Sequence, residues 1–398
     1  MSVAISDSRL DRRHPAGPTN VEIIDDARRF TLLRPEWNSL LTGSRADCPF
    51  LTWEWLHAWW THLGGGTRRL QLLTVRAGNE LIGVAPLALA CARLPWLSTL
   101  EFLGTGHAGS DYLDLIVRRN REEEGVRAMA DSLIAQKRTL RLDHLPPSSL
   151  SAQLADELAA HGWTSLAASS GVCPVVTLAG HSWDSYLAML GAAHRANVRR
   201  RMRAIERRFD VCFSRVLSEP ERREGLSTLV ALHNRRWNRR GGSTAFPTRA
   251  LCAFHDEVTR LALEAGWLRL YVLRLDAAPV AALYGFVRTG RFYFYQSAFD
   301  ERYGQYGIGM VMMGLAIRAA IEEGLLEFDL LYGTESYKQL WARDQRLLER
   351  RDLFPANVGG RIHRRTVQAK RTARRLAHRI LPRGNPCETS LAPAGACF

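Results

Sequence analysis

The same order of predicted strands and helices occurs twice in the chain, 198 residues apart, and this repeat most constrains its fold. Segments 70–90 and 268–288 both carry apolar runs on either side of a short polar turn, which predicts a β-hairpin in each. Each hairpin is followed by more strand, a helix, and a strand bearing an aspartate, Asp143 or Asp329. Three identities accompany the pattern: Leu70 with Leu268, Leu72 with Leu270, and Arg76 with Arg274. We therefore expect an α/β (α+β) protein of two tandem units, each a mixed, largely antiparallel sheet flanked by helices.

The length of 398 residues accommodates two such units with flanking segments. We place an N-terminal unit at residues 21–180 and a C-terminal unit at residues 181–355. Residues 1–20 lack periodicity and predict a flexible leader, and residues 356–398 form a basic tail. Two helices, near 219–239 and 248–265, are expected as an insertion before the second hairpin.

The formal net charge of +14 is concentrated in two segments, residues 195–210 and 353–398. Arginines spaced by four residues in the first segment lie on one helical face: Arg195, Arg199, Arg203 and Arg207. Such a face either meets an anionic group or remains a solvated arginine surface. The tail mixes apolar and basic residues, so it either lies on an anionic membrane surface or forms a solvated helix.

The sequence favours a cytoplasmic protein. The first fifteen residues lack the apolar core of a secretion signal, and the longest apolar stretch, 310–321, is interrupted by Arg318. The seven cysteines lack the close spacing of a zinc site, so we expect no metal and no disulfide framework.

A glycine-containing loop links the strand at 291–297 to a helix, with glycines at 304, 307 and 309. Glycine lets the backbone approach a ligand, and the N–H groups and dipole at a helix start favour phosphate. The alternative is a structural tight turn. The matching place in the first unit, 118–125, has three glutamates, which would repel a diphosphate. Only the second unit is therefore expected to hold a phosphorylated ligand.

Four further motifs accompany this loop: an aromatic segment at 49–56, a basic helix at 194–208, His-x-x-Arg-Trp at 233–237, and Gly-x-x-x-Tyr-Lys-x-x-Trp at 333–341. With the strand, glycine loop, helix and strand order, the sequence resembles the GNAT acyltransferase fold. It is most similar to the duplicated branch with the CelD-like (cellulose biosynthesis) acetyltransferases and the Fem-type peptidyltransferases. The loop departs from the usual Arg/Gln-x-x-Gly-x-Gly/Ala, because its first position is Gly304.

The resemblance implies an acyltransferase dependent on an acyl-CoA, in particular acetyl-CoA. An amine or hydroxyl of a polar acceptor, such as a sugar or polysaccharide precursor, would attack the thioester directly. One alternative is a Fem-like aminoacyl-tRNA-dependent peptidyltransferase, whose arginine segments would bind tRNA. Otherwise nucleic acid is not an expected partner. A third alternative is a non-catalytic scaffold of a polysaccharide machine, with the tail making a peripheral contact at the inner membrane.

The resemblance also implies roles for individual residues. Tyr337 would protonate the leaving thiolate, Lys338 would stabilise the oxyanion, and Glu335 would act as the base. Each has a structural alternative: a packed tyrosine, a surface lysine, and a glutamate that favours a helix start. The other candidate bases are Asp300, His233, His255 or a water relay.

Cofactor contacts and acceptor contacts complete this set. The residues expected to bind the diphosphate are Gln305, Tyr306, Gly307, Ile308 and Gly309. Those expected along the pantetheine arm are Tyr295, Gln296 and Ser297. Those expected to bind the acceptor are Arg195, Arg199, His233 and Trp237.

Overall fold

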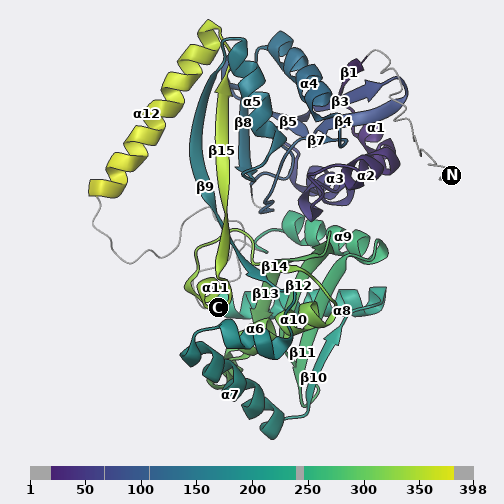
Figure 1. The fold of residues 1–398 in the computed structure, drawn as a ribbon, viewed down its shortest axis with the longest axis vertical. Coiled ribbons are helices and arrows are strands. Elements are labelled where there is room, and N and C mark those ends of the chain that lie inside the picture. Colours follow the sequence, from purple (N-terminus) through teal and green to yellow (C-terminus); the bar gives the residue numbers. More distant parts are fainter. Residues whose placement is uncertain (1–18, 67, 107, 239–245, 381–398) are drawn as a thin grey trace, which may run out of the picture.

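The computed structural model describes residues 19–66, 68–106, 108–238 and 246–380 (Figure 1). The predicted leader, residues 1–20, therefore lies almost wholly outside the described residues, as does the end of the tail. Among the described residues, no helix combines the length and apolar character needed to cross a lipid bilayer.

The elements of the N-terminal unit follow the predicted order. In chain order they are β1 (Thr19–Ile24), α1 (Ala27–Leu32), α2 (Arg34–Thr42), the 3-10 helix η1 (Pro49–Leu51), α3 (Trp53–Leu63), β2 (Arg68–Leu70), β3 (Leu72–Ala77), β4 (Glu80–Ala85), β5 (Leu87–Ala90), η2 (Pro95–Leu97), β6 (Thr99–Phe102), β7 (Ile116–Val117), α4 (Glu122–Gln136), β8 (Thr139–Leu145), α5 (Leu150–Ala160) and β9 (Thr164–Thr177). The strand β7 spans only Ile116–Val117, and the chain before it turns at Tyr112, whose φ is 58°. Residues 103–106 and 108–115 belong to the connection between β6 and β7.

The C-terminal unit contains the two inserted helices and a strand that the sequence did not reveal, β15. Its elements are α6 (Trp183–Met189), α7 (Ala192–Arg208), β10 (Val211–Arg215), α8 (Glu219–Asn238), α9 (Arg249–Glu264), β11 (Leu268–Leu275), β12 (Ala278–Arg288), β13 (Arg291–Phe299), η3 (Glu301–Tyr306), α10 (Ile308–Glu322), β14 (Glu327–Asp329), α11 (Ser336–Trp341), β15 (Asp344–Phe354) and α12 (Val358–Ile380).

The duplication is visible in strand pairing. The β3–β4 hairpin closes with Ala77 opposite Glu80, and the β11–β12 hairpin closes with Leu275 opposite Ala278, 198 residues later. Each unit also has one parallel pair of three residue rungs, β6 with β8 and β13 with β14. These matching pairs confirm two tandem units with mixed, largely antiparallel sheets.

One sheet of 11 strands joins the two units, in the order β10-β11-β12-β13-β14-β9-β15-β8-β6-β5-β2. Figure 1 shows β9 and β15 as long neighbouring strands that run from one unit to the other. The C-terminal end of β9 pairs with β14 of the second unit, and the C-terminal end of β15 pairs with β8 of the first. The units therefore share backbone hydrogen bonds across the boundary expected near residue 180.

The faces of the second unit's sheet belong to different cores. Phe292 and Phe294 belong to a core with α10 and α7 that also takes in Val176 and Leu178 at the end of β9. Tyr295, on the other face, belongs to a core that includes Trp55 of α3. The Trp55 ring lies 5.3 Å from the Tyr295 ring, and its indole N–H donates to Ser110 Oγ at 2.8 Å. Burying such large aromatic surfaces across the boundary stabilises the two units as one body.

Candidate functional site

The strand β14 ends after its third rung with β13, and the site is organised around this end. The parallel pairing ends at Tyr293 opposite Asp329, while β13 continues to Phe299. The connection after β6 in the N-terminal unit contacts both strands here. Tyr295 donates its hydroxyl hydrogen to the Ala108 carbonyl, and Tyr112 donates to Asp329 Oδ2 at 2.6 Å. The N-terminal unit thus covers part of the region where the β13–β14 pairing ends.

Asp329 anchors this contact and is fully buried. Its Oδ1 accepts the Leu331 N–H at 2.8 Å, and its Oδ2 accepts from Arg346 of β15 at 3.0 Å. Burial raises the pKa of Asp329 to about 6, although the hydrogen bonds from Tyr112 and Leu331 and the charge of Arg346 oppose the rise. All these partners are protein groups, so we assign Asp329 to holding the joint between units.

A histidine–aspartate pair lies beside the same contact between the two units. The Nδ1 atom of His144, near the end of β8, is 3.0 Å from Asp111 Oδ1. The other carboxylate oxygen of Asp111 accepts the Tyr332 N–H at 2.8 Å, and Asp111 is buried. The carboxylate accepts, so Nδ1 carries the proton and the neutral ring keeps its lone pair on Nε2. The His144 side chain is 21% exposed, and its ring centroid lies 5.5 Å from that of Tyr332.

Two opposing effects set the pKa of His144. Burial lowers it, but the hydrogen bond from His144 to Asp111 and the negative charges of Asp111 and Asp143 together raise the pKa above its ordinary value. His144 also adopts a φ of 56°, which is uncommon for a residue other than glycine. The pair therefore has the geometry of a general base whose orientation is fixed by a buried carboxylate.

Lys338 and Glu335 contact each other rather than an open cleft. The Lys338 side chain is 1% exposed, and its Nζ is 3.1 Å from Glu335 Oε2. It donates to the Tyr332 carbonyl at 2.6 Å and to the Leu331 carbonyl at 3.3 Å. Lys338 is thus not a surface lysine, and it fastens the segment that follows β14. Tyr337 is half-buried and packs against the core around α10.

The glycine loop places a residue in the left-handed conformation directly before α10. Gly307 precedes α10 with a φ of 62°. It has no side chain, so it cannot cap the N–H groups in the first turn of the helix. The first turn contains no acidic residue. Arg201 of α7 lies over this turn: its guanidinium donates to the Gln305 carbonyl, and its Nε is 3.0 Å from where a Gly307 Cβ would stand. The turn is therefore electropositive through both backbone and side chain.

The three residues expected along a pantetheine arm occupy β13 beyond the last β14 rung. The side chains of Tyr295 and Gln296 are buried, and Ser297 is 8% exposed. On the β12 side, Gln296 pairs with Tyr284 and Ser297 pairs with Leu283. The other backbone edge of β13 pairs with β14 only over Arg291–Tyr293, so these three residues lie beyond that pairing.

The residues expected to bind an acceptor are not gathered in one place. Arg195 donates to the carbonyls of Ala188 and Leu190, so it holds the turn before α7. Arg199 is exposed and pairs with Asp184 at 3.2 Å. His233 is buried in α8, where burial and then the Arg236 charge lower its pKa to about 4. Trp237 belongs to α8, but its side chain lies outside the described residues.

The remaining candidate bases have structural partners. Asp300 caps η3 through the Arg302 N–H and also pairs with Arg235. The hydrogen bond from the Arg302 side chain is the largest effect that lowers the pKa of Asp300, so this carboxylate is a weak base. His255 is buried, with its Nδ1 2.6 Å from the Tyr284 hydroxyl.

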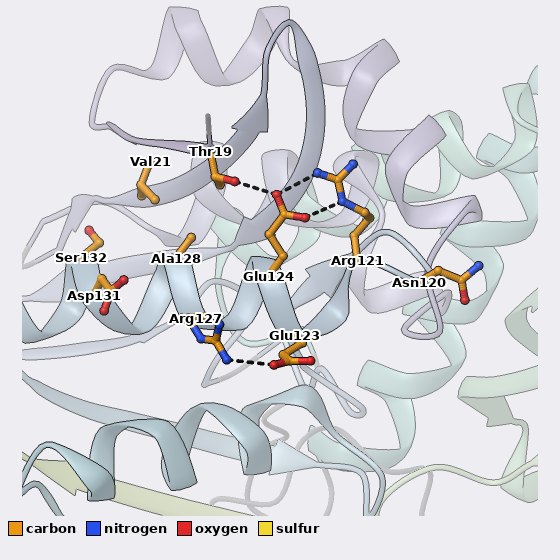
Figure 2. Close-up of a pocket in the computed structure, with 10 residues that line it drawn as sticks. All are labelled: Thr19, Val21, Asn120, Arg121, Glu123, Glu124, Arg127, Ala128, Asp131 and Ser132. Atoms are coloured by element: carbon orange, nitrogen blue, oxygen red, sulfur yellow. Dashed lines mark hydrogen bonds and ion pairs between the residues drawn. The ribbon is translucent and has the colours of Figure 1, made fainter. Parts of the chain in front are cut away.

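The first unit differs from the second at the matching helix start. A hollow of about 830 Å³ lies along α4. Figure 2 draws the residues that line it, among which Glu124 bonds Thr19 and Arg121, and Glu123 pairs with Arg127. These carboxylates lie in the first turn of α4, where they complement the helix dipole. Across the described segments, no group of three or more His, Cys, Asp or Glu residues could hold a metal ion.

Sequence reasoning missed Asp111, His144 and Arg201. Asp111 follows a glycine-rich stretch and His144 lies near a strand end, which is a weak signal for two residues 33 positions apart. Arg201 lies outside the four-residue spacing that drew attention to α7. The contact that each residue makes is set by packing between distant segments.

Residues 192–339, which run from α7 into α11, match the family model described as "Acetyltransferase (GNAT) domain". This part of the chain is therefore similar to that domain family. No curated protein sequence matches the chain.

Solved structures resemble the whole two-unit arrangement. A crystal structure of FemX has a TM-score of 0.57 and 14% identity, covering 79% of this chain and 95% of that chain. L-PGS from Bacillus licheniformis has a TM-score of 0.50 and 12% identity, covering 86% of this chain and 96% of that chain. The C-terminal domain (DUF2156) of a candidate lysylphosphatidylglycerol synthetase from Agrobacterium fabrum has a TM-score of 0.52 and 10% identity, covering 84% and 95%. At these identities the likeness concerns the fold alone.

Proposed function

We propose that the protein transfers an acyl group, in particular acetyl, from coenzyme A to the amine or hydroxyl of a polar acceptor such as a sugar or polysaccharide precursor. The observation that carries the proposal is the electropositive turn at Gly307, which follows a strand, β13, that continues beyond its pairing with β14. A CoA thioester combines a diphosphate with an extended amide-bearing arm. The turn suits the diphosphate, and the backbone edge of β13 beyond Tyr293 suits the amides of the arm.

Arg201 is part of this donor site in the proposal. Asn197 Oδ1 lies 3.4 Å from its Nε, and the Gln305 carbonyl accepts from its terminal nitrogen, so the guanidinium is held over Gly307. A guanidinium is a permanent cation with donors in a planar fork, which matches phosphate oxygens. The equivalent turn of α4 has glutamates in its place, and we therefore assign donor binding to the second unit alone.

We assign the base to His144 rather than to Glu335. The Glu335 carboxylate is committed to Lys338, whereas His144 has an oriented ring and a free lone pair on Nε2. The acceptor's nucleophilic atom forms a bond to the acyl carbon, its proton moves to His144 Nε2, and the C–S bond breaks. The departing thiolate then takes a proton from a nearby acid. Tyr337 remains our candidate for that acid, and the Lys338 contacts hold the segment that carries it.

Binding of coenzyme A tests the donor site directly. We expect Arg201→Gln to weaken CoA affinity by about tenfold or more, because one charge-assisted hydrogen bond to phosphate contributes roughly 1.5–3 kcal/mol. Isothermal titration calorimetry on the full-length protein measures this dissociation constant.

Arg203→Gln is the matched control, since Arg203 lies on the same helix and is exposed. Its CoA affinity should stay within about twofold of the unsubstituted protein. Equal affinities for the two variants would remove Arg201 from the donor site. Absence of CoA binding at millimolar concentration would overturn the acyl-CoA proposal itself.

A second candidate donor is an aminoacyl-tRNA, and the exposed arginines of α7 favour it: Arg199, Arg200, Arg203, Arg207 and Arg208. A long anionic ligand could follow this helix toward the Gly307 turn. Affinity for tRNA that falls steeply with salt, together with no affinity for CoA, would select this donor.

A further inference from the structure

The helix α12 projects from the N-terminal unit after β15 (Figure 1). Its inner face contacts the protein. His363 and Val367 are buried, His363 Nδ1 lies 3.1 Å from Thr139 Oγ1, and Arg364 donates to Thr164 Oγ1 at 3.2 Å. Arg371 pairs with the buried Asp352 of β15. These contacts fix which way the helix is turned.

Three large apolar residues of α12 lie on the face turned away from the protein. Val358 is 62% exposed, Ile362 is 49% exposed and Leu376 is 50% exposed. With a rotation of 100° per residue about the helix axis, these three positions lie within about 40° of one another, on the side roughly opposite Val367. Ala369 and Ala373 extend the same line and are also exposed. We call this line of five residues the outer stripe. A surface helix normally buries its apolar side against the protein, so the outer stripe is adapted to another apolar phase.

The exposed apolar surface continues from α12 onto the neighbouring helix η2. Trp96 is 52% exposed and Leu94 is 45% exposed. The Trp96 Cβ lies 3.2 Å from where a Gly359 Cβ would stand, which places η2 against the start of α12. A tryptophan at such an edge suits the boundary between water and lipid.

The charges on α12 select the kind of surface that covers the stripe. The helix contains eight Arg and Lys residues and no Asp or Glu. Arg361 and Arg365 flank the outer stripe on one side, and Lys370 flanks it on the other; all three are exposed. An apolar line between cations matches the interface of an anionic bilayer, where acyl chains take the stripe and phosphate headgroups take the flanks.

Two other occupants fit less well. A second copy of the helix would bring its own arginines against these cations, and like charges repel. A nucleic acid would satisfy the cations but would leave Val358, Ile362 and Leu376 in water or against phosphates.

We propose that the outer stripe of α12, with Trp96 and Leu94 of the η2 region, docks the protein peripherally on an anionic membrane surface. This contact would confine acyl transfer to acceptors at or near that surface, but it does not depend on the identity of the donor.

Flotation of the full-length protein with vesicles tests the proposal. We expect binding to vesicles of phosphatidylcholine mixed with phosphatidylglycerol, and at least about tenfold weaker binding to phosphatidylcholine alone. Ile362→Gln combined with Leu376→Gln should weaken binding to the anionic vesicles by about tenfold or more, because net charge is retained while two apolar side chains are lost.

Thr372→Gln is the matched control, since it changes an exposed position of α12 outside the outer stripe. It should bind the anionic vesicles as the unsubstituted protein does. The melting temperatures of all variants should agree, because none of the three positions is buried.

Three outcomes would overturn the proposal. The stripe variant could bind anionic vesicles with unchanged affinity, which would reduce the contact to charge alone. The protein could ignore vesicles but bind RNA through the same helix. It could instead sediment as a dimer that the stripe substitutions dissociate, which would assign the stripe to a second copy of the chain.

Discussion

His144→Gln is expected to lower kcat/KM for acyl transfer by about 10² to 10⁴-fold, the contribution typical of a general base. Glutamine keeps a polar side chain of similar length, but it cannot accept the proton that the acceptor loses. The affinity for CoA should stay within about twofold, because the assigned donor site is at Gly307 and Arg201. Steady-state kinetics and calorimetry on one preparation separate the two effects.

The pH profile shows whether His144 acts in the reaction or only in the fold. His144 is active as a base when neutral, so kcat/KM should rise with pH through an apparent pKa above the ordinary histidine value. Asp111→Asn removes the carboxylate that raises this pKa while the burial that lowers it remains. The rising limb should therefore move to lower pH, with a reduced plateau. A profile whose midpoint does not move in Asp111→Asn would show that His144 is not the titrating base.

Lys338→Met is expected to lower the free energy of unfolding by roughly 3–5 kcal/mol, as loss of one partner of a buried ion pair does. The substitution leaves the Glu335 carboxylate without its cation and leaves the Tyr332 carbonyl without its 2.6 Å donor. Methionine has a similar volume, so the loss would come from electrostatics rather than from a cavity. Urea unfolding followed by fluorescence measures it, with equal m-values as the check that both proteins unfold alike.

Two companion variants make this result interpretable. Adding Glu335→Gln to Lys338→Met should recover part of the stability, since no unpaired charge then remains buried. Lys370→Met changes an exposed lysine and should stay within about 0.5 kcal/mol. If Lys338→Met kept full stability but lost turnover, Lys338 would belong to the chemistry, as the sequence resemblance implies.

Much of the fold was predictable because its signal is local. The hairpins of both units appear where the alternating apolar segments are, and their turns are 198 residues apart. The helix after Gly307 begins where the glycine loop ends, with no carboxylate in its first turn. Apolar periodicity and turn chemistry specify such elements within a few residues of sequence.

The site was less predictable, because its contacts join segments far apart in the chain. Lysine is seldom buried, so the sequence offered no reason to place Lys338 against two carbonyls and Glu335. Three of the four α7 arginines that share a four-residue spacing, Arg199, Arg203 and Arg207, are exposed. Arg201, beside the buried Val198 and Met202, is the one that reaches the Gly307 turn.

The sequence by itself determined two units of one α/β design, with a glycine turn before the helix of the second unit and glutamates at the matching place of the first, because hydrophobic spacing and turn residues act over short distances. The tertiary structure alone decided that β9 and β15 join the units in one sheet and that Asp111 orients His144 beside Tyr332. It also decided that α12 turns its apolar stripe outward. These outcomes depend on which distant segments pack together and exclude water. The sequence of one segment does not specify the segment against which it will pack.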